Sequence, residues 1–592
     1  MVRLLRLSMS RRGAALLALG HRAVTRRGRR SSLGLERPYP WESAYPEGVT
    51  WHLDIAAKPV TAILDDAIAR FPERPCLQFY GRKYTYTEVG DLVARAARGF
   101  QDLGVGPGVK VGLLLPNSHY YVICYYAVLK AGGTVVNYNP LYAEHEVARQ
   151  IRDSGTQVMV TMNLNMLYEK VADRLSDSGL DKIVVCRMSS AFQFPANAFF
   201  AIVKRKEIAD IPADAQHVKF EKLLANDGDP RPIDIEPDSA VAVMQYTGGK
   251  IGVPMGAMLT HAGLYKNAQQ MRLWAPDIKL GQECVLAVLP LTHVFGMTGV
   301  MNYGLTIGAE IALLPRFKTG EVLKLIEQKQ PSILFAVPTM FAMFNSHPDI
   351  AEQDLSSLRY CISGGAALPA DIKATFEKIT GCRIVEGYGL SETGPVCTVN
   401  PFDGNDRDGS VGQPVPGTVI KLVSLDNPNK LVRLGESGEV CVSGPQVMAG
   451  YWLQKDESEA VLDNGFLRTG DIGYLDSDGF LYLTGRIKKL IISGGFNVYP
   501  RMVEEAILHH PAVEAVAVCG IPDQQRGENV KAYVLLRPGE SLTARALRLF
   551  LRDKIAPYEM PRKVDFVKTF PDGLTGSRST EQFAPLTVEA AE

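Results

Sequence analysis

The sequence is poor in cysteine for its length, and it lacks long apolar runs and internal repeats. Nine Cys are spread over 592 residues, an odd number with no C-x-x-C pair among them. This pattern argues against a disulfide framework and against a zinc site, and it suits a reducing compartment. No apolar run approaches the roughly 18 residues that a membrane-spanning helix needs. The sequence therefore predicts a cytoplasmic protein without a transmembrane helix.

The chain also has no net charge, but its charges are unevenly distributed. There are 64 basic and 64 acidic residues, and residues 1–35 contain nine Arg and no acid, so residues 36–592 carry a formal charge of −9. A mildly acidic body is a poor general nucleic-acid binder, and no nucleic-acid partner is expected. The Arg-rich start resembles a mitochondrial presequence, with a weaker likeness to a twin-Arg signal. The alternatives are a disordered basic tail or a translation start at Met9.

Apolar segments of strand length alternate with helical patterns through the first 400 or so residues. One helical pattern, 120–130, ends at Ala131-Gly132-Gly133, where a helix C-cap is expected. Alternation of this kind predicts an α/β body with mainly parallel sheets. The expected strands are 109–115, 157–162, 182–186, 241–246, 285–289, 310–314, 333–337, 360–363 and 383–386.

The pattern changes after Gly485-Arg486. Helices are expected at 502–508 and 544–554, and strands at 513–519, 531–536 and 563–566, which together predict a small α+β domain. We therefore divide the chain into a basic extension expected to be disordered (1–37), a large N-terminal domain (38–485) and a small, mobile C-terminal lid domain (486–592).

A glycine-rich segment follows the expected strand 241–246. It reads Thr247-Gly248-Gly249-Lys250-Ile251-Gly252-Val253-Pro254-Met255-Gly256. Closely spaced glycines allow backbone N–H groups to turn inward around phosphate oxygens. The spacing matches neither G-x-x-x-x-G-K-[ST] nor G-x-G-x-x-G. On its own the segment predicts either a phosphate loop or a turn without a ligand.

Further motifs give the chain a specific resemblance. They are Glu386-Gly387-Tyr388-Gly389-Leu390-Ser391-Glu392, Thr469-Gly470-Asp471, and Gly485-Arg486 followed by Gly495-Phe496-Asn497-Val498-Tyr499-Pro500. With the glycine-rich segment, and in this order over residues 45–570, they resemble the AMP-forming adenylating superfamily of acyl-CoA synthetases, luciferases and adenylation domains. The chain looks most like bacterial long- and medium-chain fatty acyl-CoA ligases. The resemblance implies activation of a carboxylate by ATP and Mg²⁺ to an acyl-adenylate, followed by transfer to coenzyme A.

The resemblance also implies roles for particular residues. Tyr388 stacks on adenine, Ser391 holds a phosphate oxygen, Glu392 binds Mg²⁺, and Asp471 accepts from the ribose hydroxyls with help from Arg486. His293 falls at the acyl pocket, where the alternative is a hydrogen-bonded core histidine. The expected catalytic residues are Glu392, Ser391, Lys250 and His293, and the expected nucleotide-binding residues are Thr247, Gly248, Gly249, Gly364, Gly365, Ala366, Glu386, Gly387, Tyr388, Gly389, Asp471 and Arg486.

Several positions depart from the family pattern. Lys250 and Ile251 stand where the family usually has two hydroxyl residues, Met255 and Ser577 stand where it has Lys, and Lys489 and Met502 replace acids. Losing one positioned cation from a phosphoryl-transfer site costs several kcal/mol of transition-state stabilisation. We expect impaired adenylation, with Lys250 either partly replacing the missing cations or pointing to solvent.

Two alternatives to a full ligase remain open from the sequence. One is an inactive relative that binds nucleotide or acyl ligand, and the other is a partial enzyme that performs only the thioester half-reaction. The substrate is expected to be a fatty or similar apolar carboxylic acid. Peripheral membrane contact is expected where aromatic and aliphatic residues precede Lys204-Arg205-Lys206, unless the apolar residues are buried against the body. These are Phe192, Phe194, Phe199, Phe200, Ile202 and Val203.

Overall fold

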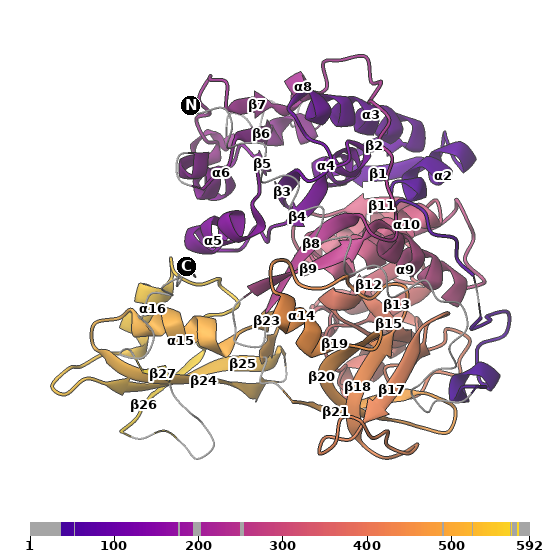
Figure 1. Cartoon of the computed structure of the whole chain (residues 1–592), viewed down its shortest axis with the longest axis vertical. Helices are drawn as coiled ribbons and strands as arrows, with labels where there is room; N and C mark the ends of the chain where they lie inside the picture. The colour runs from indigo at the N-terminus through magenta and orange to yellow at the C-terminus, as the bar shows by residue number, and fades with distance from the viewer. Residues whose placement is uncertain are drawn as a thin grey trace, which may run out of the picture. The chain divides into compact units, whose positions relative to one another are not determined.

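The computed structural model describes residues 37–52, 54–175, 178–192, 200, 203–248, 254–487, 491–523, 525–568, 570 and 577–578 (Figure 1). The described residues from Pro40 onward form one compact unit. The predicted basic extension lies outside the described residues apart from Arg37, so its disorder stays a prediction.

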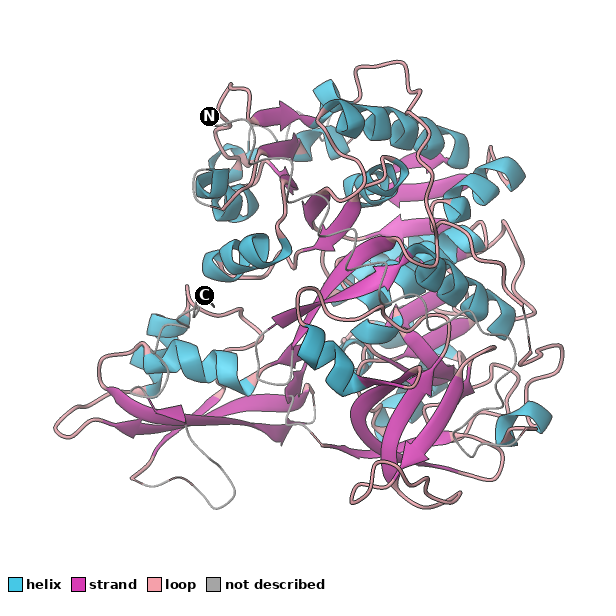
Figure 2. Cartoon of the chain, in the orientation of Figure 1, coloured by secondary structure: helices cyan, strands magenta, loops and turns pink. Residues whose placement is uncertain are grey.

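Two mainly parallel sheets form the core of the N-terminal body (Figure 2). One has seven strands in the order β7-β6-β5-β3-β4-β8-β9, and the other has nine in the order β16-β15-β14-β13-β12-β10-β11-β1-β2. Among the described residues of these two sheets, the antiparallel pairs are β8/β9, β1/β2, β14/β15 and β15/β16. The strands of the first sheet are β3 Lys110–Leu114, β4 Thr134–Asn137, β5 Val158–Met162, β6 Lys182–Cys186, β7 His217–Lys219, β8 Val241–Gly248 and β9 Pro254–Thr260. Those of the second are β1 Pro75–Phe79, β2 Arg82–Thr85, β10 Cys284–Ala287, β11 Glu310–Leu313, β12 Ile333–Ala336, β13 Tyr360–Ser363, β14 Ile384–Gly389, β15 Val396–Val399 and β16 Gln413–Pro414.

Helices connect and cover these strands, and their ends follow from local chemistry. Helix α3 begins at a capping box, in which the Thr85 hydroxyl accepts the Glu88 N–H and the Glu88 carboxylate accepts the Thr85 N–H. Helix α4 ends just before Gly132, whose φ of 85° favours glycine. The helices of the body are α2 Ala62–Arg70, α3 Tyr86–Asp102, α4 His119–Lys130, α5 Glu144–Ser154, α6 Asn165–Ala172, α8 Phe220–Leu223, α9 His261–Trp274, α10 Tyr303–Thr306, α11 Thr319–Lys329, α12 Pro338–Asn345, α13 Ala370–Thr380 and α14 Lys455–Val461.

A third, antiparallel sheet completes the body. It has the order β17-β18-β20-β19, with β21 also paired to β20. Its strands are β17 Val419–Val423, β18 Gly438–Ser443, β19 Leu462–Asp463, β20 Phe466–Leu475 and β21 Leu481–Arg486. Strands β20 and β21 carry two of the predicted site residues, Asp471 and Arg486, at directly paired positions.

A sheet of six strands and two helices form the smaller C-terminal domain. Helices α15 and α16 lie along one side of this sheet (Figure 1), and apolar residues from both helices share a core with the strands. The elements are β22 Ile491–Ser493, β23 Phe496–Val498, α15 Pro500–Leu508, β24 Val513–Asp523, β25 Gly527–Leu536, α16 Ala544–Leu551, β26 Lys563–Phe566 and β27 Ser577–Arg578. The division of the chain at residues 485 and 486, and the mobility of the lid, stay predictions.

The predicted fold class is confirmed, and the expected strands agree with the observed ones to within a few residues at each end. The glycine-rich segment, expected as a phosphate loop or as a turn without a ligand, joins two strands of a hairpin. Its two ends are paired strands, since Thr247 pairs with Met255 and Gly248 with Pro254 in the β8/β9 hairpin. The central residues 249–253, including Gly249, Lys250 and Ile251, lie outside the described residues.

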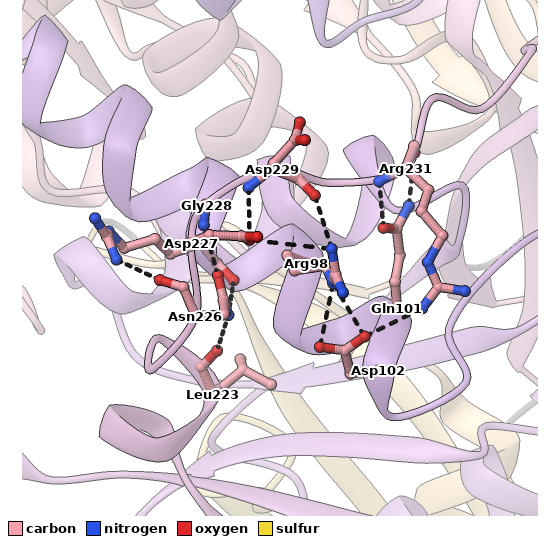
Figure 3. A network of polar contacts seen from close by, with 10 residues as sticks. Arg98, Gln101, Asp102, Leu223, Asn226, Asp227, Gly228, Asp229 and Arg231 are labelled. Carbon is pink, nitrogen blue, oxygen red and sulfur yellow. Dashed lines mark hydrogen bonds and ion pairs between the residues drawn. The ribbon is translucent and has the colours of Figure 1, made fainter.

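The long connection between β7 and β8 is fastened to helix α3 (Figure 3). The Gln101 side chain donates to the Arg231 carbonyl at 2.8 Å and accepts the Arg231 N–H at 2.7 Å. Arg98 adds a hydrogen bond of 3.2 Å to the Asp229 carbonyl. None of these residues lines the cavity of the candidate active site. The network therefore stabilises the body and takes no part in that site.

The apolar segment before Lys204 is partly covered. Phe192 and Phe200 are half-buried, stack at a centroid distance of 5.0 Å and pack against the main core, which agrees with the burial alternative for these two residues. Val203 is 56% exposed, while Phe194, Phe199 and Ile202 lie outside the described residues. In the described part of the chain, no helix is both long and apolar enough to cross a bilayer.

Candidate active site

A cavity of about 1060 Å³ lies where strands of both parallel sheets end. Asn137 is the last residue of β4, and Tyr388 is the next-to-last residue of β14. Val337 and Gly364 directly follow β12 and β13. Carboxyl ends of parallel strands are the usual place for a ligand in α/β sheets, because loops of different strands converge there. The fold therefore brings together segments that are far apart in the sequence.

Most of the predicted site residues line this one cavity. Gly248 is paired within the hairpin and is not among the lining residues, and Gly249 and Lys250 lie outside the described residues. Those that line it are Thr247, His293, Gly364, Gly365, Ala366, Glu386, Gly387, Tyr388, Gly389, Ser391, Glu392, Asp471 and Arg486.

Asp471 is the centre of a polar cluster at one end of the cavity. Its two carboxylate oxygens accept the Tyr388 hydroxyl at 2.6 Å and Arg486 Nε at 2.7 Å. Burial raises the pKa of Asp471, and the positive charge of Arg486 opposes this rise. The arrangement presents an aromatic ring and a paired carboxylate side by side, which suits a nucleoside with ribose hydroxyls.

The loop after β13 lines the cavity together with this cluster. Glu386 is buried, and its carboxylate accepts the Leu368 N–H at 3.0 Å, which fixes the far end of the loop. Burial also raises the pKa of Glu386. A Cβ on Gly364 would lie 3.0 Å from the Phe295 ring, so glycine lets the loop pass this ring without displacing it. Glu386 therefore shapes the loop through backbone contact.

Glu392 lies in a short 3₁₀ turn, η7 Ser391–Thr393, at a second polar part of the cavity. Its Oε1 accepts the Tyr451 hydroxyl at 2.7 Å. Ser391 next to it is buried. Among the described residues, no group of three or more His, Cys, Asp or Glu could hold a metal ion by itself. One carboxylate beside a phosphate site nevertheless fits Mg²⁺, which takes one or two carboxylates together with substrate phosphates.

His293 lines the same cavity as the polar cluster and the apolar side chains. Its side chain is exposed to the cavity while protein surrounds it, and this desolvation lowers the pKa of His293 to about 4. Nδ1 accepts the Phe295 N–H at 3.3 Å, so the neutral ring keeps its proton on Nε2. Buried Asn117 fixes the same loop by donating to the Leu289 carbonyl and accepting the Leu291 N–H. The ring is thus a neutral hydrogen-bond donor at the cavity wall.

The remaining wall is largely apolar. Trp274 is buried there, with its indole N–H bonded to the Asn400 carbonyl at 3.2 Å, so only its hydrocarbon surface faces the cavity. A wall of this kind accommodates an apolar group and disfavours a charged one. Its members are Met271, Trp274, Leu289, Phe295, Tyr303, Phe335, Met340, Tyr360, Ile362 and Phe402.

The positions that depart from the family pattern are spread over the structure. Met255 is buried in β9 and lines the cavity. Met502 lies in α15, and Ser577 pairs with Val516 at the edge of the C-terminal sheet. Ile251 and Lys489 lie outside the described residues.

Sequence reasoning missed Tyr451, which contacts Glu392 although 59 positions separate the two in the chain. Tyr451 lies in an irregular segment between β18 and α14, outside the sequence motifs that indicated the site. Only the pairing of this segment with β9 brings it to the site.

Comparison with known proteins supports this description. Residues 64–452 match the AMP-binding enzyme family, and residues 502–577 match the AMP-binding enzyme C-terminal domain. The chain belongs to the AMP-binding enzyme family, so the resemblance inferred from its motifs is confirmed.

Individual relatives cover nearly the whole chain. A long-chain-fatty-acid–CoA ligase of Bacillus subtilis (strain 168) is 40% identical over 546 residues, which are 91% of this chain and 96% of that protein. A long-chain-fatty-acid–CoA ligase of Escherichia coli O6:H1 is 33% identical over 548 residues, 90% of this chain and 96% of that protein. Among solved structures, the amide bond synthetase McbA from Marinactinospora thermotolerans matches with a TM-score of 0.74 at 25% identity, over 87% of this chain and 96% of that one.

Proposed function

We propose that this protein is a fatty acyl-CoA ligase, which activates a fatty acid with ATP and transfers the acyl group to coenzyme A. The observation that carries the proposal is one cavity in which the Tyr388 and Asp471 cluster and the apolar wall meet beside His293. A nucleotide at the polar cluster and an apolar carboxylic acid at the apolar wall would share this one cavity. The names of the B. subtilis and E. coli relatives agree with this substrate class.

In this proposal the residues of the polar end bind ATP. Tyr388 offers its ring to adenine, and Asp471 accepts from the ribose hydroxyls while it keeps its contacts with Tyr388 and Arg486. Ser391 donates to a phosphate oxygen. Glu392 would hold the Mg²⁺ that accompanies the phosphates, and this cation would neutralise part of their negative charge. The neutral His293 Nε2–H is placed to donate to the fatty acid carboxylate without adding a charge to the apolar wall.

The first half-reaction is an in-line displacement. A carboxylate oxygen of the fatty acid bonds to the α-phosphorus of ATP, the bond to the bridging oxygen breaks, and pyrophosphate leaves with its electron pair. In the second half-reaction the thiol of coenzyme A gives its proton to water and its sulfur bonds to the acyl carbon. The bond from the acyl carbon to the phosphate oxygen breaks, and AMP leaves with that electron pair. Ligases of this family use ATP and coenzyme A in this sense.

A second cavity of about 670 Å³ shares Thr247, His293 and Ser391 with the first. Basic side chains on its walls include Arg149, Arg152 and Lys554. We assign the phosphate groups of coenzyme A to this side, because phosphate binds to arginine and lysine through charge-assisted hydrogen bonds. Charge reversal of Arg149 and Arg152 is expected to raise KM for coenzyme A and to leave adenylate formation unchanged.

The proposed function is tested by incubating the protein with ATP, Mg²⁺, coenzyme A and one acid at a time. Palmitate, octanoate, 4-coumarate and acetate form a suitable panel, with acyl-CoA and AMP measured by chromatography. We expect acyl-CoA from the fatty acids in preference to the other two. Preference for 4-coumarate or acetate would contradict the substrate class. Pyrophosphate release without acyl-CoA would contradict the ligase.

The inactive relative is not favoured, because the similarity to ligases extends over 91% of the chain. The impaired adenylation expected from Met255 and Ser577 stays a prediction. So does the mitochondrial alternative, since residues 1–36 lie outside the described residues.

We further propose peripheral contact with anionic membranes, where the fatty acid is dissolved. Exposed Val203 next to exposed Lys204, Arg205 and Lys206 supports it, although Lys204 also pairs with Glu207. Changing the three basic residues to Glu is expected to abolish flotation with vesicles that contain phosphatidylglycerol. Unchanged flotation would reject this surface.

A further inference from the structure

Residues 448–452 form a short bridge between the glycine-rich hairpin and Glu392. On the hairpin side, the Met258 N–H donates to the Gly450 carbonyl at 2.9 Å and the Trp452 N–H donates to the Gly256 carbonyl at 2.8 Å. On the other side, the Met448 N–H donates to the Glu392 carbonyl at 2.8 Å. The bridge thus acts as an extra strand along β9, with its other end fixed to the backbone of η7.

Tyr451 is the side chain of this bridge that reaches the site. It is 7% exposed, lines the cavity and donates its hydroxyl to Glu392 Oε1. Its own N–H donates to Ser458 Oγ at 2.8 Å, which fixes the backbone at this position. Since an ionised carboxylate can only accept, the tyrosine hydroxyl is the donor of this contact.

We infer that Tyr451 is a positioning residue, which orients the Glu392 carboxylate for the Mg²⁺ of bound ATP and ties that carboxylate to the hairpin. The inference rests on the proposed function, in which Glu392 is the carboxylate that takes the cation.

The chemistry of the contact supports this role. One oxygen of a carboxylate that accepts a fixed hydroxyl is held in place, and the other is then aimed in a defined direction. Without the hydroxyl, the Glu392 side chain is free to rotate about its own torsions. Since the bridge also pairs with β9, the carboxylate keeps its distance from the hairpin on which the phosphates are expected. A residue that only packed would need no hydroxyl at this point.

The test is the affinity for ATP of the full-length protein, measured by calorimetry with Mg²⁺ and again in EDTA. In Tyr451→Phe we expect Kd for ATP with Mg²⁺ to rise about tenfold and Kd in EDTA to change by less than about twofold, as for loss of a group behind a metal ligand. An equal loss of affinity in both conditions would overturn the inference, because a merely structural residue affects both alike.

Three further variants make the comparison specific. Tyr474→Phe removes the hydroxyl of a tyrosine that stacks on Tyr482 away from the cavity, and it should leave both affinities unchanged. Ser458→Ala removes the hydrogen bond that fixes the Tyr451 backbone, and it should cause a smaller loss of ATP affinity that again appears only with Mg²⁺. This variant keeps the test available if Tyr451→Phe does not fold. In a Glu392→Ala background, Tyr451→Phe should have no further effect. A tenfold loss that persists in that background would overturn the inference.

The two proposals fail separately. A wild-type protein that makes no acyl-CoA from any acid would contradict the proposed function, and the binding comparison would still decide whether Tyr451 acts through Glu392.

Discussion

Asp471 and Arg486 face each other across the antiparallel pair β20 and β21, with Arg486 Nε 2.7 Å from Asp471 Oδ1. The Tyr388 hydroxyl occupies the other carboxylate oxygen. The carboxylate is therefore oriented before any ligand arrives, by one group from its own sheet and one from the end of a parallel strand. Such preorganisation lowers the entropy that nucleotide binding has to overcome.

Asp471→Asn is expected to weaken binding of both ATP and AMP. The change removes the charge that faces Arg486 and leaves that guanidinium without its partner. Hydrogen bonds to charged groups contribute about 1.5–3 kcal/mol, so Kd should rise at least about tenfold. The measurement is the rise in melting temperature with added nucleotide. Asp426→Asn, in an exposed turn, is the control, and an equal nucleotide response in both variants would remove Asp471 from the site.

His293 is expected to act as a neutral group over the working pH range. Because the pKa of His293 lies at about 4, its protonation does not change between about pH 6 and 8. His293→Ala should lower kcat/KM for the fatty acid about tenfold, as for one lost hydrogen bond, and should leave the shape of the pH profile and Kd for ATP unchanged. His52→Ala, at an exposed position that lines neither cavity, serves as the control. A loss that varies with pH in this range would show that the histidine titrates during the reaction.

The sequence predicted most of the parallel strands because buried strands such as Lys182–Cys186 are continuous apolar runs, but it missed the parallel strands β1, β4 and β7. It did not predict β9, since Pro254 and Gly256 are poor strand formers and pairing with β8 overrides their propensity. The motifs led to Glu392 and Asp471, but they did not lead to the partners of these residues. Tyr451 reaches Glu392 through tertiary pairing alone, and no local pattern of residues carries that information.

The missing cations offer a gain-of-function test. Met255 lines the cavity from β9, so a lysine there can direct its ammonium toward the hairpin side. Ser577 is the position at which the resemblance implies the lysine of the family's C-terminal motif. Met255→Lys with Ser577→Lys should raise ATP–pyrophosphate exchange about tenfold or more. Thioester formation from supplied acyl-adenylate should not change. Met166→Lys adds a cation at a side chain that is 61% exposed and serves as the control. No gain in the double variant would mean that these positions do not limit adenylation.

Two buried glutamates are expected to make the protein less stable at alkaline pH. Glu146 accepts the Ala143 N–H at 2.7 Å and Glu559 accepts the Ala556 N–H at 2.9 Å, so both are fixed in buried positions. Burial raises the pKa of Glu146 to about 7, and burial together with the charge of Glu146 raises the pKa of Glu559 to about 8.

The direction of the pH effect follows from these values. In the unfolded chain both groups ionise near 4.5, while in the folded chain they remain protonated until about 7 and 8. Their contribution to stability is therefore fully present below pH 4.5 and is lost as the pH rises toward 8, by about 2 kcal/mol or more.

Glu559→Gln keeps a neutral group of the same shape at all pH values. We expect the fall in melting temperature between about pH 5 and 8 to be smaller in this variant than in the wild type. Glu540→Gln changes an exposed glutamate in the same domain and should behave like the wild type. If Glu559→Gln and the wild type lose the same number of degrees over this range, Glu559 is ionised in the folded protein and the buried pair does not control the pH dependence.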